Sequence, residues 1–270
     1  MQPLSDCSFV SCLCDNGASA GSRNWSAIAR RIKLPYDDIR DYHPQFEGYR
    51  PGTVIKQADT VLLGFPLQYP GLKPSTRSND LRTYESVTRS TGPAMTWAMH
   101  AINHLDLGEL QLAAINFNHS YQPYVRGPFH VWYELQQPET GAQNFLTGTG
   151  GFLQAILFGY AGVRVHLDRL EIRATTSESP MELNPPGSSG ITAKGLRYLG
   201  ALITIAKTIN QSEVVVTNMT TALTIELSGE DTAIDVIVNE TYFLNSRTAI
   251  IRPKNVPYRG CDLPEDLIGG

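Results

Sequence analysis

The sequence predicts a mixed protein in which a helical part is followed by a small antiparallel β-sandwich. Up to about residue 161, apolar residues recur at helical spacing, and long loops stand on alternate connections. Beyond residue 162, short runs alternate apolar and polar residues, which is typical of strands with one buried face. The hydrophobic content of 41% is enough to form a core and excludes a wholly disordered chain. Helices joined in this way indicate a helical hairpin array or an α/α barrel.

The chain divides into four segments on this pattern. Residues 1–23 are rich in Ser, Cys and Gly without any period and form an unassigned tail. We expect a helical domain over residues 24–162, a sandwich-like domain over residues 163–252 and a second tail over residues 253–270. A length of 270 residues allows one large domain or two modest ones, in keeping with this division.

Apolar periodicity places the helices of the first domain. The expected helices cover residues 25–32, 78–88, 93–105, 109–118 and 150–160. Pro93 stands at the start of the third helix, where proline is favoured because its missing N–H needs no partner. A long loop is expected over residues 121–148.

Residues 35–58 are predicted to form a long polar loop, because they hold several Gly, Pro and Asp residues. The ring-bearing residues of this loop are Tyr36, Tyr42, His43, Phe46 and Tyr49. Aromatic and acidic side chains on such a loop fit the rim of a sugar or other ligand site. The alternative is that the rings pack the loop onto the body of the protein. The sequence leaves both interpretations open.

The second domain is expected to contain several short strands rich in Thr, Val and Ile. They cover residues 163–172, 195–206, 213–217, 222–227, 233–238 and 248–251. Turn residues separate these runs, and a Pro-rich loop stands at residues 177–189. This spacing is typical of an antiparallel sandwich.

The charge balance and the hydropathy exclude several classes of function. The formal net charge is −4 and no run is rich in Lys or Arg, which argues against a nucleic-acid or membrane-surface partner. The mean hydropathy is −0.19, and no uncharged apolar run reaches the roughly 18 residues that a membrane span needs. We therefore expect neither a nucleic-acid partner nor a membrane span.

Neither the cysteines nor the histidines form a convincing metal site. Cys7, Cys12 and Cys14 lie together without a second ligand pair at zinc spacing, and Cys261 is far along the chain. His100 and His104 are four residues apart on an expected helix, but the Glu of a zinc-protease motif is missing between them. We predict no metal and no cofactor.

Five Asn-x-Ser/Thr sequons are compatible with the secretory route. They start at Asn24, Asn118, Asn210, Asn218 and Asn239. Residues 1–23 lack a basic start and an apolar centre, so they do not resemble a signal peptide. Localisation and oligomeric state therefore stay open at the level of sequence.

Glu134 is the strongest candidate for acid–base chemistry. It follows Val131, Trp132 and Tyr133 on the loop that is expected between two helices. Hydrolysis of a glycosidic bond requires one carboxyl group that donates a proton and one that activates a water molecule. The alternative is an ordinary solvated glutamate of a surface loop.

Two further features are compatible with a carbohydrate site. Lys56 and Gln57 offer several donors and one acceptor for sugar hydroxyls, although the dipeptide alone has no specificity. The glycines of residues 147–151 open an expected helix, where they bring backbone N–H groups close to a ligand or permit close helix packing. They are not a nucleotide-binding loop, because no Lys-Ser/Thr follows them.

Several runs between residues 25 and 164 together resemble one enzyme family. They are Ile-Lys-Gln-Ala-Asp at 55–59 with Val-Leu-Leu-Gly-Phe-Pro at 61–66, Tyr-Glu-x-Val-Thr at 84–88 with Gly-Pro-Ala-Met-Thr-Trp at 92–97, and Phe-x-Val-Trp-x-Glu at 129–134 with Gly-Ala-x-Asn-Phe-Leu-Thr-Gly-x-Gly-Gly-Phe-Leu-Gln-Ala at 141–155. In these runs the chain resembles glycoside hydrolase family 65. That family holds acid trehalases, disaccharide phosphorylases and a glucosidase that acts on glucosylgalactosyl-hydroxylysine of collagen.

The resemblance implies the C-terminal part of an (α/α)6 barrel followed by a β domain, and inverting hydrolysis of α-glucosides. Glu134 would be the general base that activates water. Lys56 and Gln57 would hold the glucose that is released, and Trp97 and Trp132 would form walls of its pocket. The implied partner is a carbohydrate or a glycosylated hydroxylysine.

The nucleophile and the branch of the family are further implications of the resemblance. The His with which phosphorylases of the family bind phosphate is missing from residues 95–97 and 145–148, so water is the expected nucleophile. The runs at 92–97 and 144–148 are most similar to the collagen-glucosidase branch, with an α,α-trehalase as the alternative.

Two departures from the family pattern affect these expectations. Tyr133 stands where the family leads us to expect Thr. In full-length members the general acid is a Glu on a stretch before the residue that corresponds to Trp25, and we find no counterpart in residues 1–23. We therefore expect this chain alone to be inactive, since the loss of a proton donor costs about 10²–10⁴-fold in rate. A non-catalytic carbohydrate-binding remnant is the remaining alternative.

Overall fold

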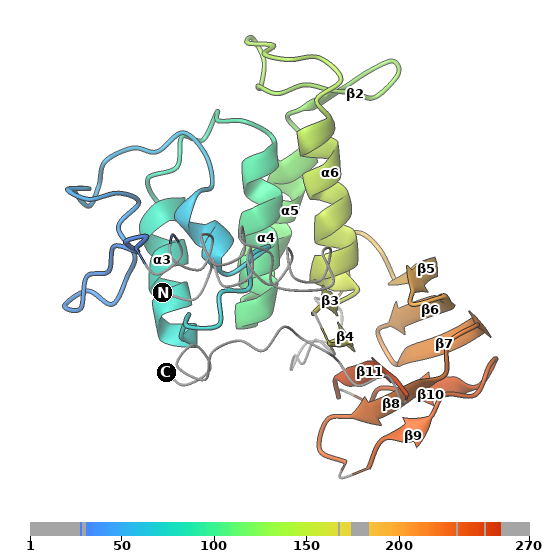
Figure 1. The fold of residues 1–270 in the computed structure, drawn as a ribbon. Helices are drawn as coiled ribbons and strands as arrows, with labels where there is room; N and C mark the ends of the chain where they lie inside the picture. Colours follow the sequence, from blue (N-terminus) through green and yellow to red (C-terminus); the bar gives the residue numbers. More distant parts are fainter. Residues whose placement is uncertain are drawn as a thin grey trace. The chain divides into compact units, whose positions relative to one another are not determined.

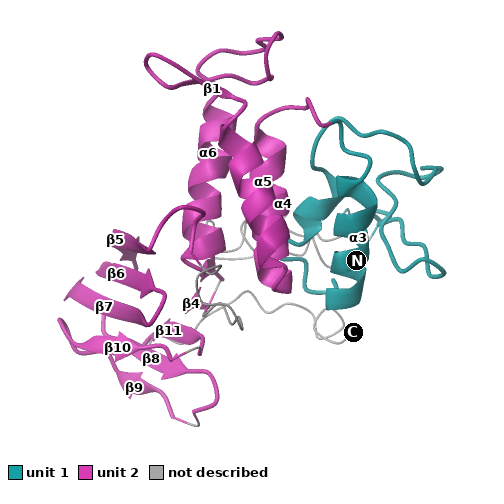
Figure 2. Cartoon of the chain, turned by 180° about the vertical axis from the view of Figure 1, so that it is seen from behind, with its two compact units in different colours: residues 1–89, 257–270 teal, residues 90–256 magenta. Residues whose placement is uncertain are grey.

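The computed structural model describes residues 28, 31–166, 168–173, 184–230, 232–245 and 247–254. The chain forms two compact units, residues 1–89 with 257–270 (unit 1) and residues 90–256 (unit 2), which Figure 2 distinguishes by colour. The predicted tail at 1–23 lies outside the described residues, as do the predicted helix at 25–32 for the most part and the predicted tail at 253–270 beyond residue 254. The predicted boundary at residue 162 stays a prediction.

Unit 1 is built around the helix α3 (Pro74–Glu85). The short 3₁₀ helix η1 (Thr60–Leu63) precedes α3 in the chain. α3 begins four residues earlier than predicted, because Pro74 occupies its first position. Tyr84 of α3 is fully buried, and its hydroxyl donates to the carbonyl of His43 at 2.7 Å. The rings of Tyr42 and Tyr49 pack against Tyr84 at 6.4 and 5.5 Å between centroids. These two rings therefore pack the loop, as the second interpretation predicts.

The helices of unit 2 are α4, α5 and α6, followed by a π-helical turn η2 (Figure 1). Their bounds are Met95–Leu107, Leu110–Tyr121, Leu146–Gln154 and Ala155–Tyr160. α4 ends at Gly108, whose φ of 76° lets its N–H donate to the carbonyls of His104 and Leu105. No helix in the described residues is long and apolar enough to span a membrane.

Glycines allow α6 and η2 to lie close to α4. A Cβ added at Gly151 would lie 3.3 Å from the Cβ of Ala98, and one at Gly159 would lie 2.8 Å from Leu105. Gly148 is equally tight, since an added Cβ would lie 2.9 Å from the Cβ of Ala94. These three glycines therefore serve close helix packing.

Unit 2 continues into two antiparallel sheets. Their strand orders are β10-β7-β6-β5 and β3-β4-β11-β8-β9, and a separate two-stranded sheet pairs β1 with β2 in the loop before α6. The strand bounds are Val125–Arg126 (β1), Val131–Trp132 (β2), Val163–Val165 (β3), Leu170–Ile172 (β4), Gly190–Tyr198 (β5), Ala201–Thr208 (β6), Ser212–Met219 (β7), Leu223–Leu227 (β8), Ile234–Asp235 (β9), Thr241–Phe243 (β10) and Ala249–Pro253 (β11). The mixed class with helices and antiparallel sheets is confirmed.

Two of the predicted strands are wrong in extent, because each contains a tight turn. The run at 163–172 divides into β3 and β4, since the chain reverses where the N–H of His166 donates to the carbonyl of Arg169 at 2.9 Å. The run at 195–206 divides into β5 and β6 at Leu199 and Gly200, which have φ values of 46° and 80°. Two successive positive φ values are those of a hairpin turn that matches the twist of its strands.

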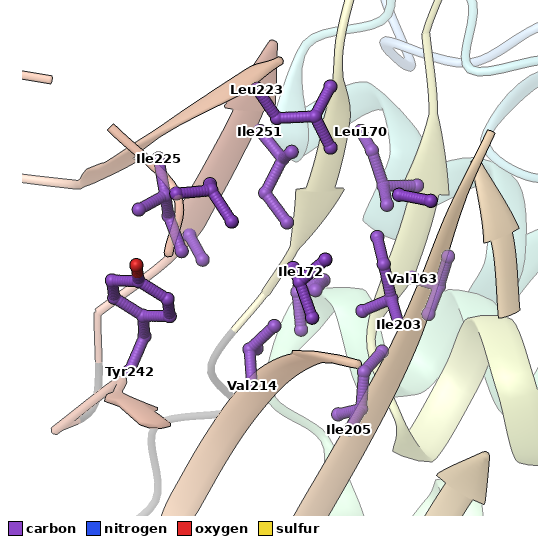
Figure 3. Packing of buried hydrophobic residues seen from close by; sticks show 14 of the residues in the cluster. Val163, Leu170, Ile172, Ile203, Ile205, Val214, Leu223, Ile225, Tyr242 and Ile251 are labelled. Atoms are coloured by element: carbon purple, nitrogen blue, oxygen red, sulfur yellow. The ribbon is translucent and has the colours of Figure 1, made fainter. Parts of the chain in front are cut away.

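The two sheets share one apolar core (Figure 3). Alternate residues of β6 and β7 point into it, among them Ile203, Ile205 and Val214. Ile172 and Ile225 meet them from the other sheet. The alternation of buried and half-buried positions along these strands is the period of two that the sequence shows.

A buried arginine connects the end of the helical segment with the first strands. Arg164 of β3 is 1% exposed, and its Nη2 donates to Oδ1 of Asp106 in α4 at 2.6 Å. Its Nη1 donates to the carbonyl of Val163 at 2.8 Å and to that of Phe158 in η2. A buried charge of this kind is tolerated because it is both paired and hydrogen-bonded.

A buried lysine lies in the same region. Lys207 of β6 is 4% exposed, and its Nζ donates to the carbonyls of Arg173 and Tyr160 at 2.7 and 3.3 Å. Burial, and next to it the charge of Arg164, lower the pKa of Lys207 from 10.5 to about 7.

We predict that this lysine makes stability depend on pH. Between pH 7 and about 10.5 the unfolded chain binds a proton at Lys207 that the folded chain does not. The free energy of unfolding should therefore rise with pH in this window, by at most about 1.4 kcal/mol per unit from this group. In Lys207→Met this contribution should vanish, whereas Lys194→Met, which replaces an exposed lysine, should keep it. Urea midpoints between pH 7 and 10 measure it, and equal slopes in wild type and Lys207→Met would contradict it.

Candidate active site

Glu134 lies two residues beyond β2 on a loop that backbone hydrogen bonds hold at both sides. Its N–H donates to the carbonyl of Ala142 at 2.9 Å, and its carbonyl accepts from the N–H of Ala94 at 2.9 Å. Its carboxylate is half-buried, and Oε2 accepts from the N–H of Ala142 at 3.1 Å. Among the described residues, Oε1 accepts no hydrogen bond. One carboxylate oxygen is thus fixed and the other is available to a ligand or to water.

Gly141 allows this carboxylate to turn back onto its own loop. A Cβ added at Gly141 would lie 2.8 Å from the Cβ of Glu134 and 2.9 Å from Oε2. The φ of Gly141 is 57°, in the left-handed region that L side chains adopt at a cost of about 1–2 kcal/mol. Both the space and the backbone conformation at this position therefore require glycine.

The resemblance implies that Trp97 and Trp132 form walls of the glucose pocket. Both lie near this loop, but they differ in how far their side chains are exposed. Trp97 is 4% exposed and its ring is stacked on His119 at 4.1 Å between centroids. Trp132 is half-buried, packs against Phe152 at 5.4 Å, and its Nε1 has no hydrogen-bond partner among the described residues. Trp132 and Trp97 belong to one apolar cluster.

A network that the sequence analysis missed holds the loop to the helices. Gln136, two residues after Glu134, donates from Nε2 to the carbonyl of Ser90 at 2.7 Å and to the hydroxyl of Tyr124 at 3.1 Å. The same Nε2 lies 3.1 Å from Nε2 of His119. The two hydrogens of this amide are used by the carbonyl of Ser90 and the hydroxyl of Tyr124, so the approach to His119 is a close contact and not a third donated bond. Burial lowers the pKa of the His119 imidazole. No local signal in the sequence joins these residues, because they are distant in the chain.

Lys56 and Gln57 lie in unit 1, between an isolated bridge and η1. The neighbouring Ile55 pairs in parallel with Thr88, and its N–H donates to the carbonyl of Val87 at 3.0 Å. The side chain of Lys56 is exposed and that of Gln57 is half-buried. Their role in holding glucose stays a prediction.

The two histidines of α4 are buried in packing positions. His104 pairs through Nδ1 with Oε2 of Glu109 at 2.7 Å, and His100 stands edge-on to Trp97 at 5.6 Å. Within the described ranges, no group of three His, Cys, Asp or Glu side chains is arranged to hold a metal ion.

The chain is similar to known proteins in sequence and in fold. No protein-family model matches the chain. It is 48% identical over 176 residues to a protein-glucosylgalactosylhydroxylysine glucosidase of Danio rerio, a match that covers 65% of this chain and 25% of that protein. A Mus musculus protein of the same name is 42% identical over 184 residues, covering 68% and 25%. An acid trehalase of Emericella nidulans is 37% identical over 119 residues, covering 41% and 11%.

The chain therefore spans about a quarter of the length of the glucosidases that it matches. A solved structure assigned as a kojibiose phosphorylase from the human microbiome aligns with a TM-score of 0.58 at 13% identity, covering 83% of this chain and 34% of that one. At this identity the likeness concerns the fold alone. The sequence comparisons confirm the resemblance on which the site residues were predicted.

We predict that Gly141→Ala releases the carboxylate of Glu134 from its loop. The added Cβ and the positive φ should lower the free energy of unfolding by about 1–2 kcal/mol and should accelerate exchange of the Ala142 amide hydrogen. Gly150→Ala is the matched control, because no atom lies within 4 Å of its added Cβ. Urea unfolding and amide hydrogen exchange measure both effects. Wild-type exchange at Ala142 in Gly141→Ala would show that the loop does not depend on this glycine.

Proposed function

We propose that this chain is part of a glycoside hydrolase family 65 protein. The whole protein would be an inverting α-glucosidase that removes glucose from glucosylgalactosyl-hydroxylysine of collagen-type substrates. The observation that carries the proposal is a difference in identity. Glucosidases of that name from four organisms are 40–48% identical to the chain, whereas acid trehalases are 30–37% identical. The substrate is therefore assigned from the glucosidases rather than from the trehalases.

Glu134 suits the role of general base. In an inverting reaction this carboxylate removes a proton from the water that attacks the anomeric carbon, while a second carboxyl group about 6.5–9.5 Å away protonates the leaving oxygen. Oε2 of Glu134 is held by the N–H of Ala142, and Oε1 accepts no hydrogen bond among the described residues. Such an arrangement fixes the carboxylate and leaves one oxygen for the water.

The tryptophans would divide the work of forming the pocket. Trp132 is half-buried, but its Nε1 is a buried atom that lies beside Gly148, so the face of its ring rather than its N–H would contact the sugar. Trp97 is buried and stacked on His119, so it would hold the pocket wall in place without contacting the sugar itself. Lys56 and Gln57 would hold the glucose hydroxyls through their donors.

The architecture proposed for the whole protein is an (α/α)6 barrel followed by a β-sandwich. α4, α5 and α6 would be consecutive helices of that barrel, and the two sheets would form the sandwich. The similarity in fold to the kojibiose phosphorylase structure supports this arrangement.

The test joins residues 25–270 to the upstream part of the Danio rerio relative and measures glucose release from glucosylgalactosyl-hydroxylysine. We expect the joined protein to release glucose, first as the β-anomer, since inversion converts an α-linkage into a β-product. Glu134→Gln should lower kcat by about 10²–10⁴-fold with little change in KM. Glu139→Gln, which replaces an exposed glutamate of the same loop, should retain the wild-type kcat.

Four results would contradict the proposal. Faster release of glucose from trehalose than from the collagen disaccharide would assign the trehalase activity instead. The α-anomer as first product would exclude inversion. Full activity in Glu134→Gln would remove Glu134 from the reaction, and sugar binding without turnover in the joined protein would favour a non-catalytic remnant.

A further inference from the structure

Unit 1 contains a cavity of about 470 Å³ that the proposed hydrolysis does not use. It is lined by Lys33, Leu34, Tyr36, His43, Tyr69, Gly71, Lys73 and Thr76. Neither Lys56 nor Gln57 is among these residues. The volume lies in the range of about 300–1,000 Å³ that is usual for sites of small molecules.

His43 presents a polar atom to this cavity from a buried position. The residue is 6% exposed, and Nδ1 lies 2.8 Å from Oδ2 of Asp80, itself 2% exposed. The backbone N–H of His43 donates to the other oxygen of Asp80 at 2.7 Å. The carboxylate therefore fixes the imidazole ring, and Nε2 has no partner among the described residues. An oriented ring nitrogen of this kind is ready to exchange a hydrogen bond with a ligand.

Aromatic rings stand beside His43 in the cavity wall. Tyr36 is 44% exposed, its ring lies 5.2 Å from that of His43, and its hydroxyl donates to Oδ1 of Asp41 at 2.6 Å. The ring of Tyr69 lies over the backbone of Gly71, where an added Cβ would be 2.8 Å from Cζ and the hydroxyl oxygen. Tyr36 is exposed and Tyr69 is half-buried, and accessible ring faces of this kind are surfaces on which the apolar face of a sugar ring packs.

The charges around the cavity balance one another. Lys33 pairs with Glu47 at 2.7 Å. The hydroxyls of Thr76 and Tyr36, and to a smaller extent the charge of Lys73, lower the pKa of Asp41, so that this carboxylate stands ionised near Lys73. Among the described residues the cavity thus offers donors and acceptors with opposite charges in pairs, which suits an uncharged ligand rich in hydroxyl groups.

We propose that this cavity binds a neutral hexose. The ring of the sugar lies against Tyr36 and Tyr69, and its hydroxyls bond with Nε2 of His43 and with the ammonium group of Lys73. The aromatic loop predicted from the sequence then serves two purposes, since Tyr42 and Tyr49 pack it while Tyr36 and His43 face the ligand. The proposal does not depend on Glu134 or on glycoside hydrolysis.

The test follows the amide resonances of the full 15N-labelled chain during titration with glucose, galactose and glucose 6-phosphate. We expect saturable shifts in residues 33–76 with glucose or galactose. Lys73→Gln should weaken this binding about fivefold, the usual effect of one lost hydrogen bond. Gly71→Ala should weaken it as well, because its Cβ displaces the ring of Tyr69. Gly150→Ala in α6 is the matched control and should bind as the wild type does.

Folding does not decide the outcome in Lys73→Gln and Gly71→Ala. His43→Gln disturbs a buried pair and can destabilise unit 1, whereas Lys73 is exposed and Gly71 meets only the movable end of a side chain. Tighter binding of glucose 6-phosphate than of glucose would mean that the cavity is an oxyanion site and would overturn the proposal. The absence of saturable shifts with both hexoses would overturn it too, as would unchanged hexose binding in Lys73→Gln and Gly71→Ala.

Discussion

The arrangement around Glu134 depends on the hydroxyl group of Tyr124, a fully buried residue. This hydroxyl donates to the carbonyl of Gly92 at 2.8 Å and accepts from Nε1 of Trp97 at 2.7 Å and from Nε2 of Gln136 at 3.1 Å. A phenol has one donor and two acceptor positions, and all are used here. Burial raises the pKa of Tyr124, so the donor proton stays in place. One atom thus joins the chain before α4, the first turn of α4 and the loop that carries the candidate base.

Main-chain groups hold Glu134 itself, and Arg126 holds the loop next to it. The Arg126 guanidinium lies 3.9 Å from the ring centroid of Tyr133, and its Nη2 donates to the carbonyls of Leu135 and Glu139 at 2.8 Å. Ala94 and Ala142 hold the backbone of Glu134, and the N–H of Ala142 also holds one carboxylate oxygen. Main-chain bonds position a carboxylate without a cation that would compete with the substrate for it. This arrangement requires a left-handed backbone conformation in the loop, which Gly141 adopts with a φ of 57°. A glycine in a polar loop is therefore as much a part of the candidate site as the acid itself.

Local patterns predict α4 and α5 to within three residues of their ends, because each has a continuous apolar stripe and Gly108 separates them. They fail at the turn of Leu199 and Gly200, since a leucine at positive φ has no signature in the sequence and only the pairing of β5 with β6 imposes it. Glu134 could be singled out from its motif. Tyr124 could not, because its bonds reach residues 27 and 32 positions away in the chain. Contacts between residues so far apart in the chain are determined by tertiary packing and not by the residues next to them in the sequence.

The same reasoning accounts for the two buried basic side chains, Arg164 and Lys207, at the end of the helical segment. The last residues of a helix leave carbonyls without intrahelical partners, and the π-helical turn η2 ends beneath the sandwich core, where Leu157 and Phe158 pack. Water does not reach carbonyls in such a place, so protein donors must serve them. Arg164 reaches the carbonyl of Phe158 and Lys207 reaches that of Tyr160. Long side chains from the first and fourth strands of the β segment therefore complete the helix that precedes them, which ties the helical and β parts of unit 2 through polar bonds as well as through apolar packing.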